Sequence, residues 1–249
     1  MTAVVDSPRP GLREPLLAFA AATALAAVLA QVAAVVPLVR DNLHVAIAVI
    51  FFYAPALAAR LWRRPFDYGQ AGLGIHPIKL NAAVLGAALA ITFPGFLLGF
   101  FWFYGAVCGP HGGSFAAAFG GLCARWQGWQ GGTLTFPHSF LLLALNQLVV
   151  VAIPEELFFR GYLLGRLEER WPSRRRLFGA PVGAALLVSS LLFAVGHLVV
   201  VPNPQRLAVF FPALVFGWMR ARTGSIAAGA AFHALCNLFS DVLHTSFFR

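Results

Sequence analysis

Apolar stretches separated by short polar connections run along nearly the whole chain. Seven stretches can be distinguished: 16–39, 43–62, 80–104, 137–167, 181–201, 206–219 and 225–243. A helix of about 20 apolar residues is long enough to span the hydrocarbon core of a bilayer. The pattern therefore predicts an all-α fold, a polytopic transmembrane helix bundle of about seven spans that forms one membrane domain over residues 1–249.

The polar connections divide the chain into three parts. Residues 1–15 are polar and predict a cytoplasmic tail. We expect three spans and an outer loop in residues 16–137, and a core of four spans in residues 138–245. The loop, 105–137, is rich in glycine and leaves two interpretations open. It holds either a short interfacial helix at 114–126, because tryptophans favour that depth, or an eighth span.

Composition narrows the class of protein. Hydrophobic residues make up 59% of the chain and charged residues 11%, which is typical of an integral membrane protein and not of a soluble domain. A net charge of +9 would suggest nucleic-acid binding in a soluble protein, but here the basic residues lie almost entirely in the polar connections. We therefore expect a lipid bilayer and no nucleic acid as partner.

The distribution of basic residues predicts the orientation. With the N-terminus in the cytoplasm, the outer side holds few basic residues: Arg40, Arg125, Arg206 and Arg249. Cytoplasmic connections of membrane proteins carry an excess of Lys and Arg, so the orientation and the seven-span count support each other. All basic residues except Lys79 are arginine and alanine is abundant, which favours a bacterial source and hence the bacterial inner membrane.

The cysteines indicate no metal site. Cys108, Cys123 and Cys236 show no metal-ligand spacing such as C-x-x-C. Cys108 and Cys123 share the outer loop, where they form a disulfide if the loop faces an oxidising compartment, or else remain two buried thiols.

Three ionisable side chains interrupt the fourth apolar stretch: Glu155, Glu156 and Arg160. A charged residue at the centre of a membrane helix costs about 2.5–3.5 kcal/mol, so the cluster marks either the end of the helix or a site. Glu156 and Arg160 are four residues apart and can form an ion pair along the helix, which leaves Glu155 pointing roughly 100° away. The stretch is too long for one crossing, so we expect it to project from the membrane or to bend near Pro154.

The later stretches hold few other groups able to do chemistry. His197, His233 and Asn237 lie at depths close to that of Glu155 if the helices alternate in direction. A buried carboxylate and an imidazole suit the activation of water, and an imidazole with a carboxamide can stabilise an oxyanion, which points to peptide-bond hydrolysis. The alternative is that these groups only make hydrogen bonds between helices, as we expect of Asn146 and Gln147.

The remaining histidines lie at the ends of stretches or in loops, and we interpret them as interfacial: His44, His76, His111, His138 and His244. The acidic cluster together with the two deep histidines could also hold a metal, although no H-E-x-x-H motif is present.

Three motifs follow one another on successive apolar stretches: Glu155-Glu156-x-x-x-Arg160, Phe193-x-x-x-His197 and His233-x-x-x-Asn237. In this order they resemble the signature motifs of the CPBP family, the CAAX proteases and bacteriocin-processing enzymes also called the Abi family. The resemblance covers residues 138–245, and none of the motif positions is substituted.

The resemblance implies an intramembrane endopeptidase of the glutamic type. Glu155 and His197 would bind and activate water, and His233 and Asn237 would stabilise the oxyanion. Glu156, Arg160 and Phe193 would be supporting motif residues. No cofactor is implied, and a metal such as zinc is not expected.

A membrane-anchored protein or peptide is the expected substrate, and trimming of C-terminal sorting tails or CAAX-like tails is one role in the family. A non-catalytic membrane scaffold or bacteriocin self-immunity protein of the same fold is the alternative. A transporter is a third interpretation, but no repeated half is visible. The substrate, its side of entry and the oligomeric state stay open.

Overall fold

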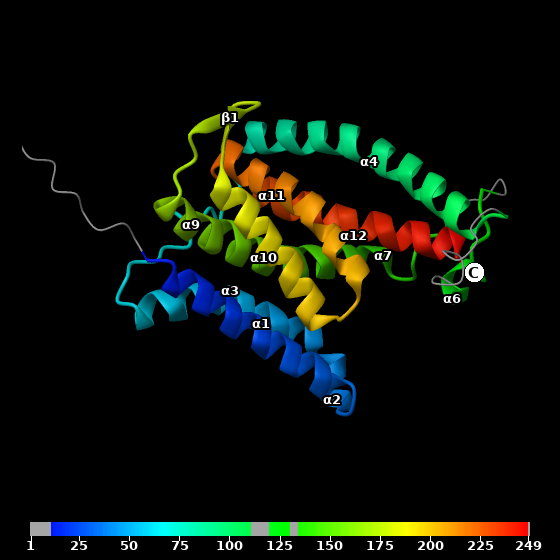
Figure 1. Ribbon diagram of the computed structural model, residues 1–249, viewed down its shortest axis with the longest axis horizontal. Helices are drawn as coiled ribbons and strands as arrows, with labels where there is room; N and C mark the ends of the chain where they lie inside the picture. Colours follow the sequence, from blue (N-terminus) through cyan, green and yellow to red (C-terminus); the bar gives the residue numbers. More distant parts are fainter. Residues whose placement is uncertain (1–10, 111–119, 130–133, 249) are drawn as a thin grey trace, which may run out of the picture.

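The structure is a computed structural model that describes residues 11–110, 120–129 and 134–248 (Figure 1). Its elements before the long central helix are α1 (Arg13–Ala33), α2 (Pro37–Asp41), α3 (Leu43–Leu61), α4 (Ile78–Cys108) and α6 (Gly120–Cys123). The central helix is made of α7 (Phe140–Asn146), η1 (Gln147–Ala152), α8 (Ile153–Glu156), η2 (Leu157–Leu163) and α9 (Leu164–Arg170). The last elements are β1 (Arg175–Leu177), β2 (Ala180–Val182), α10 (Ala184–Val200), η3 (Pro204–Val209), α11 (Phe210–Thr223) and α12 (Ala227–Phe247).

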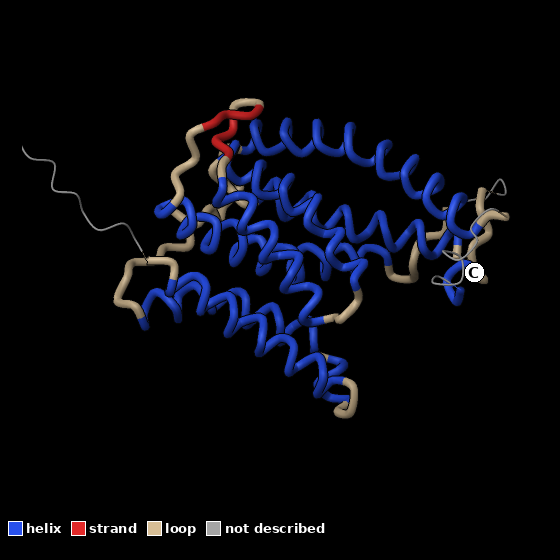
Figure 2. Tube along the Cα trace, viewed as in Figure 1, coloured by secondary structure: helices blue, strands red, loops and turns tan. Residues whose placement is uncertain are grey.

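The only strands of the described part form one antiparallel hairpin, β1–β2, where the sequence pattern predicted a plain connection, and the rest is helices and loops (Figure 2). Helices α1 and α3 pack together on one side of the bundle, and α1 also contacts α10 (Figure 1). Helix α4 lies on the opposite side, against α11 and α12. The central helix, α10, α11 and α12 form the middle of the bundle, which agrees with the predicted all-α membrane fold.

The predicted number of seven spans is not confirmed. Four helices of the described part are long and apolar enough to cross a membrane: Arg13–Ala33, Leu43–Leu61, Ile78–Cys108 and Phe140–Arg170. Helix α10 is apolar but shorter, and α11 has 14 residues because the start of the predicted sixth span forms the 3₁₀ helix η3. The first predicted span ends early, at Ala33, and its last residues form α2.

The predicted tail is shorter than 1–15, because α1 begins at Arg13. Glu14 in its first turn is buried, where it forms ion pairs with Arg64 at 2.9 Å and Arg166 at 3.2 Å and accepts a hydrogen bond from the hydroxyl of Tyr162. These contacts fasten the start of α1 to the central helix. An acidic residue two positions from the apolar stretch gave no signal of this role.

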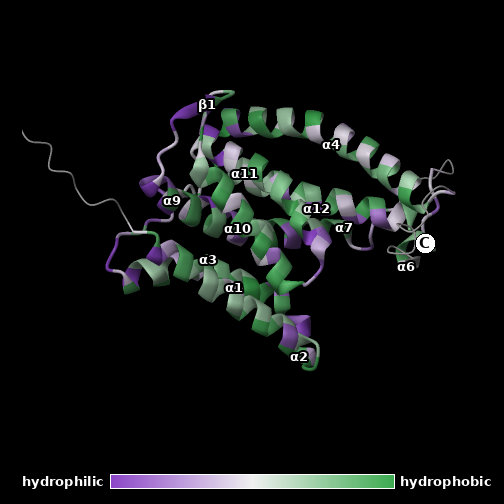
Figure 3. Ribbon diagram, in the orientation of Figure 1, coloured by the Kyte–Doolittle hydropathy of each residue, from purple (hydrophilic) through white to green (hydrophobic). Residues whose placement is uncertain are grey.

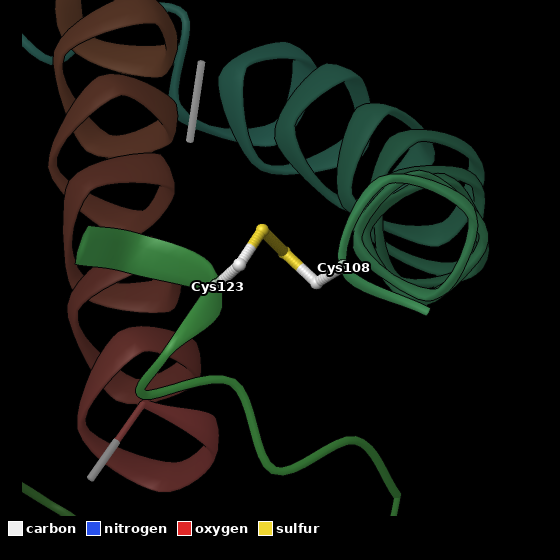
Figure 4. The surroundings of a disulfide bond; sticks show 2 residues. All are labelled: Cys108 and Cys123. Carbon is white, nitrogen blue, oxygen red and sulfur yellow. A yellow bond between two sulfur atoms is a disulfide. The ribbon is translucent and has the colours of Figure 1, made fainter. Parts of the chain in front are cut away.

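The loop 105–137, predicted to face outward, is fastened to the bundle through its described residues. Cys108 and Cys123 form a disulfide that joins the end of α4 to α6, so the disulfide interpretation is the one the structure supports (Figure 4). The backbone N–H of Gln127 donates to the carbonyl of Phe247 at the end of α12. The predicted helix 114–126 and the alternative eighth span fall partly on residues outside the described part, and within that part α6 is a single short turn.

The central helix departs from α geometry on both sides of Pro154. A proline has no N–H to donate and its ring crowds the preceding turn. The N–H of Ile153 donates to Leu148 and that of Leu164 to Phe159, both five residues back, as in a π-helix. Segments of π-helix often occur at functional sites. The sequence predicted a projecting end or a bend near Pro154; the structure has two π-helical segments there, which flank the four residues carrying both glutamates.

Gly161 on the central helix lets the loop before α4 approach closely. A Cβ at this position would lie 2.7 Å from the carbonyl oxygen of Ala71, too close for any real contact. We expect Gly161→Ala to lower the free energy of unfolding by about 1–3 kcal/mol, the usual range for overpacking. Thermal unfolding in detergent measures this. Gly165→Ala is the matched control, because nothing lies within 4 Å of that position, and equal stability of the two variants would contradict the packing argument.

Candidate active site

Glu155 faces two imidazoles in the middle of the bundle. Its Oε2 lies 3.9 Å from Nε2 of His197 on α10 and 3.8 Å from Nε2 of His233 on α12. These distances exceed direct hydrogen bonds, and each is short enough for a water oxygen to bridge the carboxylate and the imidazole. The structure thus brings together three of the residues predicted to carry chemistry, from three separate helices.

The orientation of His197 follows from its helix. Its Nδ1 lies 3.0 Å from the backbone carbonyl of Phe193, one turn earlier in α10. A carbonyl only accepts, so Nδ1 carries the proton and, in the neutral ring, Nε2 presents a lone pair toward Glu155. In this tautomer, Nε2 of His197 can accept a hydrogen bond from water.

Glu156 and Arg160 form the predicted ion pair, 3.1 Å apart and fully buried. The same oxygen of Glu156, Oε1, lies 3.1 Å from Nδ1 of His233. The carboxylate accepts there, so Nδ1 of His233 carries a proton and its Nε2 is directed at Glu155. Glu156 therefore orients the imidazole of His233, a contact that the sequence pattern did not predict.

Aromatic rings enclose the buried guanidinium of Arg160. Its Cζ lies 4.2 Å from the ring centre of Phe193 and 5.1 Å from that of Phe216, in the range of cation–π contacts. Phe216 also stacks on His233, with ring centres 4.9 Å apart. Sequence reasoning identified Phe193 but missed Phe216 on α11, because an apolar residue in an apolar stretch carries no signal.

Asn237 lies one turn after His233 on α12. Its Nδ2 donates to Oε1 of Gln147 on η1 at 2.9 Å. Gln147, expected to be a plain interhelical partner, thus holds one of the two N–H groups of Asn237 and leaves the other available. Asn146 beside it is half-buried and has no side-chain hydrogen bond within the described structure.

The two glutamates differ in how accessible they are. The side chain of Glu155 is 13% exposed and that of His197 is 23% exposed, whereas Glu156 is 0% exposed. The side chains of Glu155 and His197 are thus partly exposed and that of Glu156 is enclosed, although Oε2 of Glu155 is itself buried. The adjacent carboxylates therefore occupy different environments: that of Glu156 is enclosed and ion-paired, and that of Glu155 faces the Nε2 atoms of two imidazoles.

The other histidines lie away from this cluster. His44 is at the start of α3, His76 and His138 lie in connections, and His244 packs against Phe100 and Tyr104 near the end of α12. His111 lies outside the described residues.

The described residues contain no group of three or more His, Cys, Asp or Glu side chains arranged to hold a metal. Ligands of a tetrahedral zinc lie roughly 3.4 Å apart, since each bond is near 2.0–2.1 Å. The separations of 3.8–3.9 Å around Glu155 are wider than that.

This combination, a carboxylate and two imidazoles inside an apolar helical bundle, can activate water, as a hydrolase requires. Comparison with protein families supports that class: residues 137–239 match the family described as type II CAAX prenyl endopeptidase Rce1-like. The match contains every motif residue named above and confirms the resemblance to the CAAX protease family. The comparisons with curated proteins and with solved structures gave no match.

Proposed function

We propose that the protein is an intramembrane endopeptidase that hydrolyses a peptide bond of a membrane-anchored protein, with no metal. The observation that carries the proposal is the position of the Glu155 carboxylate opposite the Nε2 atoms of His197 and His233. The Rce1-like match supports protease activity in general. The roles of the individual residues rest on the chemistry below.

Glu155 and His197 act on the water. A water donates its two protons to the carboxylate of Glu155 and to the lone pair of His197 Nε2, and Glu155 removes one proton as the water attacks the carbonyl carbon. Positioned general bases of this kind contribute about 10²–10⁴ in rate. The proton then passes to the leaving amine.

His233 and Asn237 stabilise the oxyanion. In this role Nε2–H of His233, whose ring Glu156 holds in place, donates to the oxyanion, and Asn237 donates its second N–H. Because such donors are already oriented, they stabilise the developing charge without having to rearrange during the reaction. We place the cleaved bond near the membrane end of a C-terminal tail, the substrate class implied by CAAX-type proteases.

The direct test uses purified protein in detergent or nanodiscs with synthetic tails of anchored proteins from the same cell. Mass spectrometry of the products gives the cleavage site. Cleavage by the native protein and none by Glu155→Ala supports the proposal. If no tail is cleaved and His197→Ala retains the cellular function of the protein, the non-catalytic scaffold becomes the better account.

Gln147 orients Asn237 in this mechanism. We expect Gln147→Leu to lower kcat by about tenfold and to change KM little, because the loss of a whole oxyanion donor costs about 10²–10³. Steady-state cleavage kinetics measure both constants. Asn146→Leu, at the preceding position of the same helix, is the matched control and should leave kcat unchanged. Equal losses in both variants would mean that the effect is one of packing.

Metal-free hydrolysis has its own expected result. Cleavage should continue at the same rate after incubation with EDTA or 1,10-phenanthroline, because no step of the proposal uses a metal. A rate that falls with chelator and returns on addition of zinc would contradict this part of the proposal and leave the proteolysis itself in place.

A further inference from the structure

The hairpin β1–β2 connects the helix that carries Glu155 to the helix that carries His197. Its first strand and turn expose a run of consecutive side chains: Arg174, Arg175, Arg176, Leu177 and Phe178. Leu177 is 51% exposed and Phe178 is 82% exposed. Three exposed arginines therefore directly precede an exposed apolar tip in the chain.

The turn of the hairpin exposes Phe178 and holds its backbone in an unfavourable conformation. The two turn residues, Phe178 and Gly179, have φ of 48° and 80°, in the left-handed region. Turns of this type favour Asn-Gly, and a bulky residue is uncommon at positive φ. At 82% exposure Phe178 gains little burial within the chain to offset that cost. We therefore expect the side chain of Phe178 to contact something outside the protein.

The hairpin is fastened to the bundle, so its tip has a defined place. The indole N–H of Trp218 on α11 donates to the carbonyl of Leu177 at 2.9 Å, and Ala180 at the start of β2 is fully buried. A Cβ at Gly179 would lie 3.0 Å from Nε of Arg222, so the turn also rests against α11. The tip stands at the end of the bundle where α9 ends and α4 begins (Figure 1).

Nearby acidic groups do not neutralise the three arginines. Glu169 is engaged by Arg64 and Arg166, and Glu168 accepts a hydrogen bond from Ser173. No ion pair of Arg174, Arg175 or Arg176 occurs within the described residues. Figure 3 shows hydrophilic residues at β1 and α9, at one end of the bundle.

We propose that this hairpin binds anionic phospholipids, with Arg174, Arg175 and Arg176 on the headgroup phosphates and with Leu177 and Phe178 inserted between the headgroups. Four helices of the described part are long and apolar enough to cross a membrane, and the cationic hairpin complements an anionic membrane surface. Each basic residue near such a surface strengthens association by about fivefold. Planar guanidinium groups also match phosphate geometry. This binding is independent of the proposed proteolysis.

The test places a reporter on the tip. Phe178→Cys in a Cys236→Ser background is labelled with an environment-sensitive fluorophore and reconstituted into nanodiscs of phosphatidylcholine alone or with one third phosphatidylglycerol. We expect blue-shifted emission and quenching by headgroup-level spin-labelled lipid, both several-fold stronger with phosphatidylglycerol. The difference should shrink in 1 M salt, where the Debye length falls to about 3 Å.

The matched variants separate this hairpin from basic surface in general. Arg174→Gln, Arg175→Gln and Arg176→Gln together should abolish the dependence on phosphatidylglycerol. The pair Arg60→Gln and Arg63→Gln, exposed arginines around the end of α3, should leave it unchanged. Equal signals in both lipids, or an equal loss in both sets of variants, would overturn the proposal. A signal that appears only with two copies per nanodisc would assign the tip to a contact between copies and would overturn it too.

Discussion

Glu155→Gln is expected to lower the rate of peptide cleavage by about 10²–10⁴, the contribution of a positioned general base. The amide keeps the size of the side chain but cannot take a proton from water. The protein should fold normally, because Glu155 Oε2 makes no hydrogen bond within the described structure. Cleavage rates and thermal unfolding of the purified variant measure the two effects separately.

Glu168→Gln is the matched control on the same helix, more than three turns after Glu155. It should cleave at the native rate, because Glu168 contacts Ser173 and no site residue. If Glu155→Gln retained activity near that of Glu168→Gln, Glu155 would not be the base.

Arg160→Met is expected to lower the free energy of unfolding by about 3–5 kcal/mol, because it leaves the carboxylate of Glu156 buried without its cation. Glu156 is 0% exposed and Arg160 is enclosed by Phe193 and Phe216. The midpoint of denaturant or thermal unfolding in detergent gives the change. Met keeps much of the volume, so loss of packing contributes little.

The double variant Glu156→Gln with Arg160→Met tests the reason for that loss. Removing both charges should recover part of the stability, since no unpaired buried charge is left. It should still impair cleavage, because a neutral amide in place of the Glu156 carboxylate would orient His233 less firmly. A double variant less stable than Arg160→Met alone would contradict the charge argument.

Neighbouring glutamates acquire different tasks from their surroundings. Glu156 is held by Arg160 and His233 and is closed to water, which suits a fixed electrostatic partner. Glu155, one position earlier, points to two Nε2 atoms and is partly accessible. The i,i+4 spacing of Glu156 and Arg160 decides which of the two is neutralised within the helix.

Contacts within one helix were predictable from the sequence. The ion pair of Glu156 and Arg160 follows from helix geometry, as does the position of Phe193 one turn before His197. The meeting of Glu155, His197 and His233 was predictable at the level of depth, because helix rise per residue fixes how far each group lies from a helix end.

Contacts between helices were not predictable in the same way. The pairing of His233 with Glu156, of Asn237 with Gln147 and the stacking of Phe216 depend on how α11 and α12 rotate against their neighbours. Periodicity alone does not report rotation in helices that are apolar on nearly every face. The hairpin β1–β2 was missed because three consecutive arginines do not suggest a strand.

The number of spans shows the same limit. Stretches 181–201 and 206–219 are both apolar, which suggested two spans. The first four residues of the second stretch, however, belong to the 3₁₀ helix η3, which contains proline, and only the rest belongs to the short helix α11. Local turn chemistry, and not mean apolarity, decides where such helices begin.

The central claim is that Glu155 drives hydrolysis of anchored membrane proteins. The most direct measurement compares the C-terminal peptides of the membrane proteome, by mass spectrometry, in cells carrying the native protein and in cells carrying Glu155→Ala at equal abundance. The account predicts uncut C-terminal tails that accumulate only with Glu155→Ala, and these tails would name the substrate. An unchanged set of C-terminal peptides, with the variant folded and present in the membrane, would contradict it.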